Sequence, residues 1–321
     1  MLSKTKCLIT LVFCLTFALC CENHMERAKK HAEDGRIKEA IEEYKLALQG
    51  KEGKEAADIS LLIADLCLRE DTAEAVKWCW DAIKYDPEGY TPYIKLGEVF
   101  FEKEEIDSAL WYYSKVLELS KDEEIKGGVS SKIEDLDFKK VKKTNTLEAC
   151  IDFDSKHKDC KYKEQVEDLA FHIVKSKPTP EKVNEFLKVF PKSKYRGKLE
   201  KIGKDLEKRT IAEKVNKIHR DPDAGELPPP ERIPTDEPGE KVVTNIENDT
   251  KYKLTVYYVG PETLSVFFQP RQTKTVKLTG GIYRVAAEVN NPAVNPFKGT
   301  NTYERGYLYT VRYYIVVSRT F

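Results

Sequence analysis

The 321-residue chain lacks the residues and motifs with which most enzymes work. It has five histidines and two methionines, and it contains no G-x-S-x-G, H-E-x-x-H or phosphate-binding glycine motif. Basic and acidic side chains balance at 54 each, which removes the net charge that nucleic-acid-binding proteins use. We therefore expect no enzyme, no cofactor, no metal site and no nucleic-acid partner.

Long apolar runs are also absent, since a membrane-spanning helix needs about 20 apolar residues. The longest run, Cys7–Cys21, has 15 residues, follows Lys4 and Lys6, and ends where Glu22 restores charge. A basic start followed by a short apolar run and small residues is typical of a secretory signal. We assign residues 1–20 to a signal peptide and expect an exported protein, periplasmic or at the cell surface.

The end of this run resembles the lipobox of bacterial lipoproteins, in which a cysteine near the cleavage site is lipidated. The modified residue would be Cys21 (or Cys20). The resemblance implies an anchor in a membrane, because several acyl chains on one residue hold a protein stably on a bilayer. The alternative is ordinary cleavage near Ala18 and Cys20, which would release a soluble protein.

Small residues recur in the next segment with a period of 34 to 35 residues, first at Ala40, Ala75 and Ala109. A similar pattern of small and aromatic residues surrounds each of these positions. This pattern resembles the tetratricopeptide repeat (TPR), a pair of antiparallel helices. Small side chains at these spacings let two helices approach closely. The family's small-residue positions fall here on Ala28, Ala40, Ala47, Ala64, Ala75, Ala82, Gly97 and Ala109. The resemblance predicts three TPR repeats over residues 22–121.

A TPR fold implies binding, because stacked helix pairs form a groove lined by the first helix of each pair. Such a groove takes other proteins or peptides. On the family's groove positions this sequence has mixed charges and one aromatic ring, namely Glu26, Lys29, Asp65, Arg69, Lys95, Glu98 and Phe101. This set does not reproduce the basic clamp with which some relatives hold C-terminal carboxylates, so we predict no binding of chaperone tails.

The middle of the chain divides into three further segments. Residues 122–143 contain Gly127-Gly128 and many lysines, which predicts a loop and a bridging helix. In residues 144–220, a 33-residue period relates Phe153 and Tyr162 to Phe186 and Tyr195 and resembles divergent TPR-like units of envelope proteins, closed by a terminal helix. Six prolines make residues 221–240 an extended spacer.

From Lys241 the apolar residues alternate, which predicts short strands over residues 241–321. Turns every 8 to 12 residues favour a small antiparallel β-sandwich. Its tyrosines are dense, and we consider Tyr257, Tyr303, Tyr307 and Tyr314 as surface rings that could stack on sugars, or else as core and edge residues. Residues 295–299 are expected to form a loop, where binding usually resides. The predicted fold class is a multidomain α + β protein: an α-solenoid followed by a β-sandwich.

Four cysteines of the folded region are disulfide candidates, because an exported protein meets oxidising conditions. They are Cys67, Cys79, Cys150 and Cys160. Local pairing, Cys67 with Cys79 and Cys150 with Cys160, is one arrangement. Buried thiols that act as small apolar residues are the alternative.

Two functions from different classes fit this sequence. The first is an exported, membrane-anchored scaffold or adaptor whose groove binds other cell-envelope proteins or peptides. The second is a glycan- or peptidoglycan-binding protein that acts through the tyrosine-rich β-sandwich. A row of exposed tyrosines would favour the second, and buried rings would disfavour it.

Overall fold

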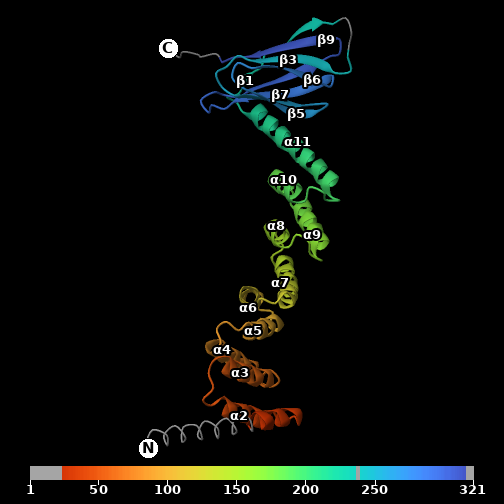
Figure 1. Ribbon diagram of the computed structural model, residues 1–321. Helices are drawn as coiled ribbons and strands as arrows, with labels where there is room; N and C mark the ends of the chain where they lie inside the picture. Colours follow the sequence, from red (N-terminus) through yellow and green to blue (C-terminus); the bar gives the residue numbers. More distant parts are fainter. Residues whose placement is uncertain (1–23, 236–238, 316–321) are drawn as a thin grey trace, which may run out of the picture. The chain divides into compact units, whose positions relative to one another are not determined.

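The computed structural model describes residues 24–235 and 239–315, which divide into two compact units (Figure 1). The first unit ends at Ala170 and the second begins at Phe171, inside helix α9. The predicted signal peptide and the lipidation candidates Cys20 and Cys21 lie outside the described residues.

In the described part of the first unit all regular structure is helical. Residues 24–33 are helical, and the helices that follow are α2 (Ile37–Leu48), α3 (Gly53–Cys67), α4 (Thr72–Tyr85), α5 (Thr91–Glu102), α6 (Ile106–Leu119), α7 (Glu123–Thr144), α8 (Leu147–Lys156) and the first part of α9 (Lys163–Ser176). Local sequence sets several helix starts. The Asp71 side chain accepts hydrogen bonds from the backbone of Ala73 and Glu74, and Pro92 stands in the first turn of α5.

The predicted small residues are buried between paired helices. Residues 24–33 pair with α2, α3 pairs with α4, and α5 pairs with α6. A Cβ added to Gly97 would lie 2.5 Å from the Tyr113 ring, so only glycine allows α5 and α6 this close approach. These helix pairs fit a TPR-like solenoid. Their small residues are fully buried, at 0% exposure for Ala28, Ala40, Ala47, Ala64, Ala75, Ala82 and Ala109.

Residues 122–143 contain a helix, as predicted, but not the predicted loop around Gly127-Gly128. They form most of α7, one continuous helix of 22 residues that begins at Glu123 and is capped by the Asp122 side chain. Gly127 and Gly128 lie inside this helix on its exposed face, where an added Cβ would meet nothing within 4 Å. The helix survives two glycines because its Val129 and Leu136 pack against α6 and bury apolar surface.

The 33-residue period appears in the structure as two equivalent ring stacks. Phe138 and Tyr162 stack with centroids 4.0 Å apart in the first unit. In the second unit, Phe171 and Tyr195 stack at 3.8 Å. The second unit continues with α10 (Pro180–Val189) and α11 (Arg196–Arg220), and Phe186 is fully buried between them and their neighbours.

Nine strands of the described chain form two mixed sheets (Figure 1). The five-stranded sheet has the order β1 (Gly225–Glu226), β8 (Phe297–Tyr303), β7 (Gly281–Val289), β4 (Leu254–Val259), β5 (Thr263–Phe268). The four-stranded sheet has the order β2 (Glu231–Pro234), β9 (Tyr307–Tyr313), β3 (Val242–Asn248), β6 (Thr273–Leu278). The prediction of a purely antiparallel module is wrong, because β1 pairs with β8 and β3 with β9 in parallel.

One core joins the two sheets. Val256, Tyr258 and Tyr283 of the larger sheet and Ile246 and Tyr309 of the smaller one belong to a single buried cluster. The rings of Tyr303 and Tyr309 meet across the sheets at 5.0 Å. Alternation of buried and half-buried residues along β3 and β4 follows the period of two that the sequence shows.

The proline-rich segment is not a free spacer in the structure. Gly225–Glu226 extends the larger sheet as β1, and Glu231–Pro234 pairs with β9 as β2. Pro234 is tolerated in β2 because this strand is a sheet edge. The terminal helix α11 also packs on the larger sheet: Ile211, Val215 and Ile218 cover Ala286, and the Lys298 ammonium donates to the backbone oxygen of Asp221 at 2.9 Å.

Candidate functional site

The predicted groove residues lie on the first helices of successive pairs. Asp65 is on α3, Lys95, Glu98 and Phe101 are on α5, and Glu26 and Lys29 belong to the helix over residues 24–33. Arg69 lies in the turn after α3, next to the C-cap residue Leu68. Glu26, Lys29, Asp65, Arg69 and Glu98 are exposed, and Lys95 and Phe101 are half-buried.

Side chains of this face connect one first helix to the next. Lys95 of α5 forms an ion pair with Asp65 of α3, and Lys132 of α7 pairs with Glu98 of α5 at 2.6 Å. The Lys139 ammonium lies 4.4 Å from the centroid of the Phe101 ring. The structure therefore brings four of the seven predicted residues into one row, which we call the first-helix face: Asp65, Lys95, Glu98 and Phe101, with Lys132 and Lys139 of α7.

The first-helix face combines exposed charge with fixed geometry. The Glu98 and Lys132 side chains are 50% and 42% exposed, so water screens their attraction and the pair adds little stability. Each charge keeps further hydrogen-bonding capacity, because one contact uses only part of a carboxylate or an ammonium. The face can therefore accept charged groups of both signs from a partner without large desolvation.

A second exposed surface lies on the second helices and was not predicted from the sequence. Trp80 of α4 and Trp111 of α6 are 39% and 49% exposed, and both rings pack edge-on against Tyr112. Tyr112 in turn stacks on Phe100 at 5.1 Å. Exposed tryptophan and tyrosine are enriched in protein interfaces. The signal was available, since all three tryptophans of the chain fall within residues 78–111.

The four cysteine candidates are free thiols in the structure, so neither predicted disulfide is present there. Cys67 and Cys79 are buried among the small residues of their hairpin. Burial raises the pKa of Cys67 to about 11 and that of Cys79 to about 12. Burial likewise raises the pKa of Cys150 to about 11. For Cys67, Cys79 and Cys150 this is the geometry of the alternative, in which buried thiols act as small apolar residues, whereas Cys160 is half-buried.

The four tyrosines considered as surface rings do not form an exposed row. Tyr303 is 1% exposed in the core. Tyr257 lies under α11 and donates a hydrogen bond to Glu288 at 2.8 Å, and Tyr307 is covered by the Arg232 guanidinium at 4.6 Å. Only Tyr314 of these four is exposed, at 55%. The tyrosines serve the core and the helix contact, since rings bury large apolar areas.

In residues 24–235 and 239–315 no group of three or more His, Cys, Asp or Glu side chains is placed to hold a metal ion. None of the helices within these ranges combines the length and the apolar character required to cross a bilayer.

No protein-family profile and no curated protein sequence matches the chain. Solved structures with similar helices include the first TPR domain of Spaghetti (RPAP3) bound to an HSP90 peptide, at 18% identity and a TM-score of 0.31, covering 37% of this chain and 90% of that one. The crystal structure of MamA is similar at 13% identity and a TM-score of 0.33, and the match covers 58% of this chain and 90% of MamA. The TPR2B domain of yeast Sti1 in its pHsp70 complex is similar at 14% identity and a TM-score of 0.28. This match covers 50% of this chain and 99% of that domain. These identities and scores are too low to carry an argument about function.

Proposed function

We propose that this protein is a scaffold or adaptor whose helical unit binds a partner protein on the first-helix face. The observation that carries the proposal is the set of ion pairs and the lysine–ring contact that link α3 to α5 and α5 to α7 on this face. A partner segment laid across these helices would exchange its own charged side chains with those of the row. Stacked helix pairs offer such an extended surface to a partner.

The test compares two variants of the full chain that each remove one cation and one anion. Lys95→Ala with Glu98→Ala alters the first-helix face on α5, whereas Lys115→Ala with Glu118→Ala removes a pair within α6. Wild type, both variants and a Trp111→Ala variant are used to capture proteins from cell-envelope extracts of the native organism. Captured proteins are then purified and their affinities measured.

We expect a partner that binds wild type and the α6 variant equally and loses about tenfold or more in affinity for the α5 variant. Thermal unfolding followed by circular dichroism checks that all variants are folded. If affinity is lost only in Trp111→Ala, the partner uses the second-helix surface and the proposal for the first-helix face is wrong. Retention of every captured protein by the α5 variant would also contradict it.

We also propose that the chain is exported and lipid-anchored, so that its partners are cell-envelope proteins. The signal-like residues 1–20 and the adjacent cysteines support this localisation. Fractionation of cells that express the full chain, with metabolic labelling by a palmitate analogue, tests the anchor. Labelling should be lost in Cys21→Ser or in Cys20→Ser, and an unlabelled protein in the soluble fraction would rule out the anchor.

A further inference from the structure

The two sheets of the second unit, which we call the β unit, have an open cleft of about 1050 Å³ at one end. The β3–β4 loop, the β5–β6 turn, the β7–β8 loop, the end of β9 and the segment around β1 all contribute to it. A volume of this size accommodates several side chains of a ligand. All of its lining residues belong to the second unit.

Arg271 occupies a strained position at the rim of this cleft. Its φ of 60° places it in the left-handed region, in the turn between β5 and β6. Glycine adopts this conformation at far lower cost than a residue with a Cβ. A long cationic side chain held in such a conformation points to a use for its guanidinium, because strained residues cluster at functional sites.

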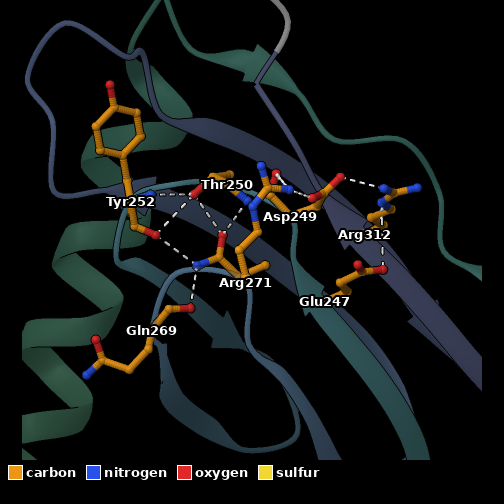
Figure 2. Close-up of polar contacts among 8 residues, drawn as sticks. Glu247, Asp249, Thr250, Tyr252, Gln269, Arg271 and Arg312 are labelled. Atoms are coloured by element: carbon orange, nitrogen blue, oxygen red, sulfur yellow. Dashed lines mark hydrogen bonds and ion pairs between the residues drawn. The ribbon is translucent and has the colours of Figure 1, made fainter.

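A buried polar frame fixes the backbone on which Arg271 stands (Figure 2). The amide of Asn248, which is fully buried, donates to the backbone oxygens of Tyr252 and Gln269, both at 2.8 Å, and its oxygen accepts from the Thr250 hydroxyl at 2.8 Å. The Arg271 backbone N–H donates to the backbone carbonyl oxygen of Thr250 at 3.2 Å. The frame ties the β3–β4 loop to the β5–β6 turn, so the rim is preorganised.

Two guanidinium groups share one carboxylate on this frame (Figure 2). Asp249 pairs with Arg271 through one oxygen and with Arg312 through the other, at 2.5 Å for Arg312. Arg312 also lies 3.6 Å from Glu247. The Asp249 side chain is only 19% exposed, but Arg271 and Arg312 are 66% and 59% exposed. One arginine would be enough to hold the two loops together. With two, the exposed guanidinium groups flank one carboxylate, and each keeps N–H donors that this carboxylate does not use.

The local charge favours an anionic group at the rim. Asp249 and Glu247 offset the two arginines, and exposed Lys251 on the same lip leaves a surplus positive charge. Guanidinium groups bind carboxylates through planar paired hydrogen bonds. Asp223 and Glu226 line the cleft on the segment around β1, so a ligand that also carries basic or neutral groups there is not repelled.

The other lining groups suit a peptide better than a sugar. Strand β1 is the free edge of the larger sheet, with Gly225 and Leu227 donating their N–H groups toward β8. Because backbone groups alternate along a strand, the N–H and C=O of Glu226 are turned away from β8. Leu227 and Phe297 offer apolar contacts in the same cleft. An extended peptide can use such an edge and fill apolar pockets with alternate side chains.

We propose that this cleft binds an extended acidic peptide, with an Asp or Glu carboxylate of the peptide held by Arg271 and Arg312. This site is separate from the first-helix face and does not depend on the function proposed for it. It gives the β unit a binding role of its own.

The experiment uses the full chain and a fluorescent peptide that alternates Glu and Val, with a Lys-Val peptide and an oligogalacturonate as the other probes. Fluorescence anisotropy measures binding. We expect the Glu-Val peptide to bind, to bind more weakly as salt is raised, and to lose about tenfold or more in affinity in Arg271→Gly and in Arg312→Ala. Arg305→Ala removes an exposed arginine outside the cleft and should change affinity by less than about twofold.

Arg271→Gly keeps the test interpretable, because glycine fits the left-handed conformation and the variant should melt no lower than wild type. Absence of Glu-Val binding to wild type, equal binding of the Lys-Val peptide, or unchanged affinity in both cleft variants would each overturn the proposal. Binding of oligogalacturonate without binding of the peptide would show that the site takes a carboxylated saccharide, and the peptide proposal would then be wrong. None of these results depends on the α5 variants that test the helical unit.

Discussion

Substituting Gly97 with alanine should destabilise the helical unit, although alanine is the better helix former. A Cβ at Gly97 would lie 2.5, 2.7 and 2.9 Å from three ring atoms of Tyr113. Contacts this short force either the ring or the helix to move. Tyr113 is fully buried, so a shift of its ring must displace the side chains packed around it.

The expected magnitude is a balance of two effects. Overpacking a buried contact costs about 1–3 kcal/mol, and we expect the upper part of this range because three atoms of the buried Tyr113 ring lie within 3 Å of the added Cβ. Replacing glycine by alanine within a helix returns about 1 kcal/mol. The free energy of unfolding should therefore fall by about 1–2 kcal/mol. Gly128→Ala in α7 is the matched control: nothing lies within 4 Å of its added Cβ, so this variant should gain about 1 kcal/mol.

Urea unfolding followed by tryptophan fluorescence measures both changes. All three tryptophans, at positions 78, 80 and 111, belong to the helical unit, so their emission reports on that unit and not on the β unit. Opposite shifts of the unfolding midpoint in Gly97→Ala and Gly128→Ala would support the packing argument. A Gly97→Ala protein as stable as Gly128→Ala would refute it, because the close approach of α5 and α6 would then not require glycine.

Three further predictions concern single groups. Burial raises the pKa of Cys67 to about 11 and that of Cys79 to about 12, so both thiols should react slowly with a thiol reagent at pH 8 and quickly in urea. Fast labelling of the native protein would contradict burial of the thiols, and no labelling in urea without reductant would contradict free thiols. Burial alone would raise the pKa of Glu262, but the Thr279 N–H and the Lys241 ammonium outweigh burial and lower this pKa below 4.5. The ionised Glu262 therefore stabilises the fold above pH 4.5, and this stabilisation is lost as the pH falls through the lowered pKa. Glu262→Gln should make acid unfolding, followed by near-ultraviolet circular dichroism, less steep with pH. Lys132→Ala should change the unfolding free energy by less than about 1 kcal/mol in the same urea assay, since its pair with Glu98 is exposed; a larger loss would show that the pair holds α5 to α7.

Local patterns predicted the elements of this fold better than their long-range pairing. The small residues spaced 34 to 35 apart predicted buried helix pairs, because close packing can be seen in residue size alone. The parallel pairing of β3 with β9 could not be predicted, since it joins Val243 to Leu308 across 65 residues with no local signature. Gly127-Gly128 suggested a loop by their intrinsic preference, and the packing of Val129 and Leu136 overrode it.

The candidate sites show a similar division. Family spacing located Asp65, Lys95 and Glu98 on first helices, but the ion pairs that join them to neighbouring helices depend on side-chain geometry that spacing does not contain. The arginines of the cleft come from the β5–β6 turn and the end of β9, and no local motif connects them. The 295–299 segment, expected as a binding loop, begins β8 at Phe297, so it is only partly a loop; its Asn295 and Phe297 line the cleft together with Asn291, Ala293 and Val294.

A non-glycine residue in the left-handed backbone region needs an explanation, and its position in the local structure supplies one in some cases but not in others. Within residues 24–235 and 239–315, three non-glycine residues have φ between 51° and 60°: Glu104 between α5 and α6, Asn145 after α7, and Arg271. Asparagine is a common helix terminator in this conformation, so Asn145 is explained by its position alone. Glu104→Gly should release strain and raise the free energy of unfolding by about 0.5–1 kcal/mol, measured by tryptophan fluorescence. Arg271→Gly also gives up the pair with Asp249, so the two effects should nearly cancel in stability and leave only the loss of peptide binding. A clear drop in stability of Arg271→Gly would mean that the arginine is kept to hold the loops together, and the case for a ligand would then fail.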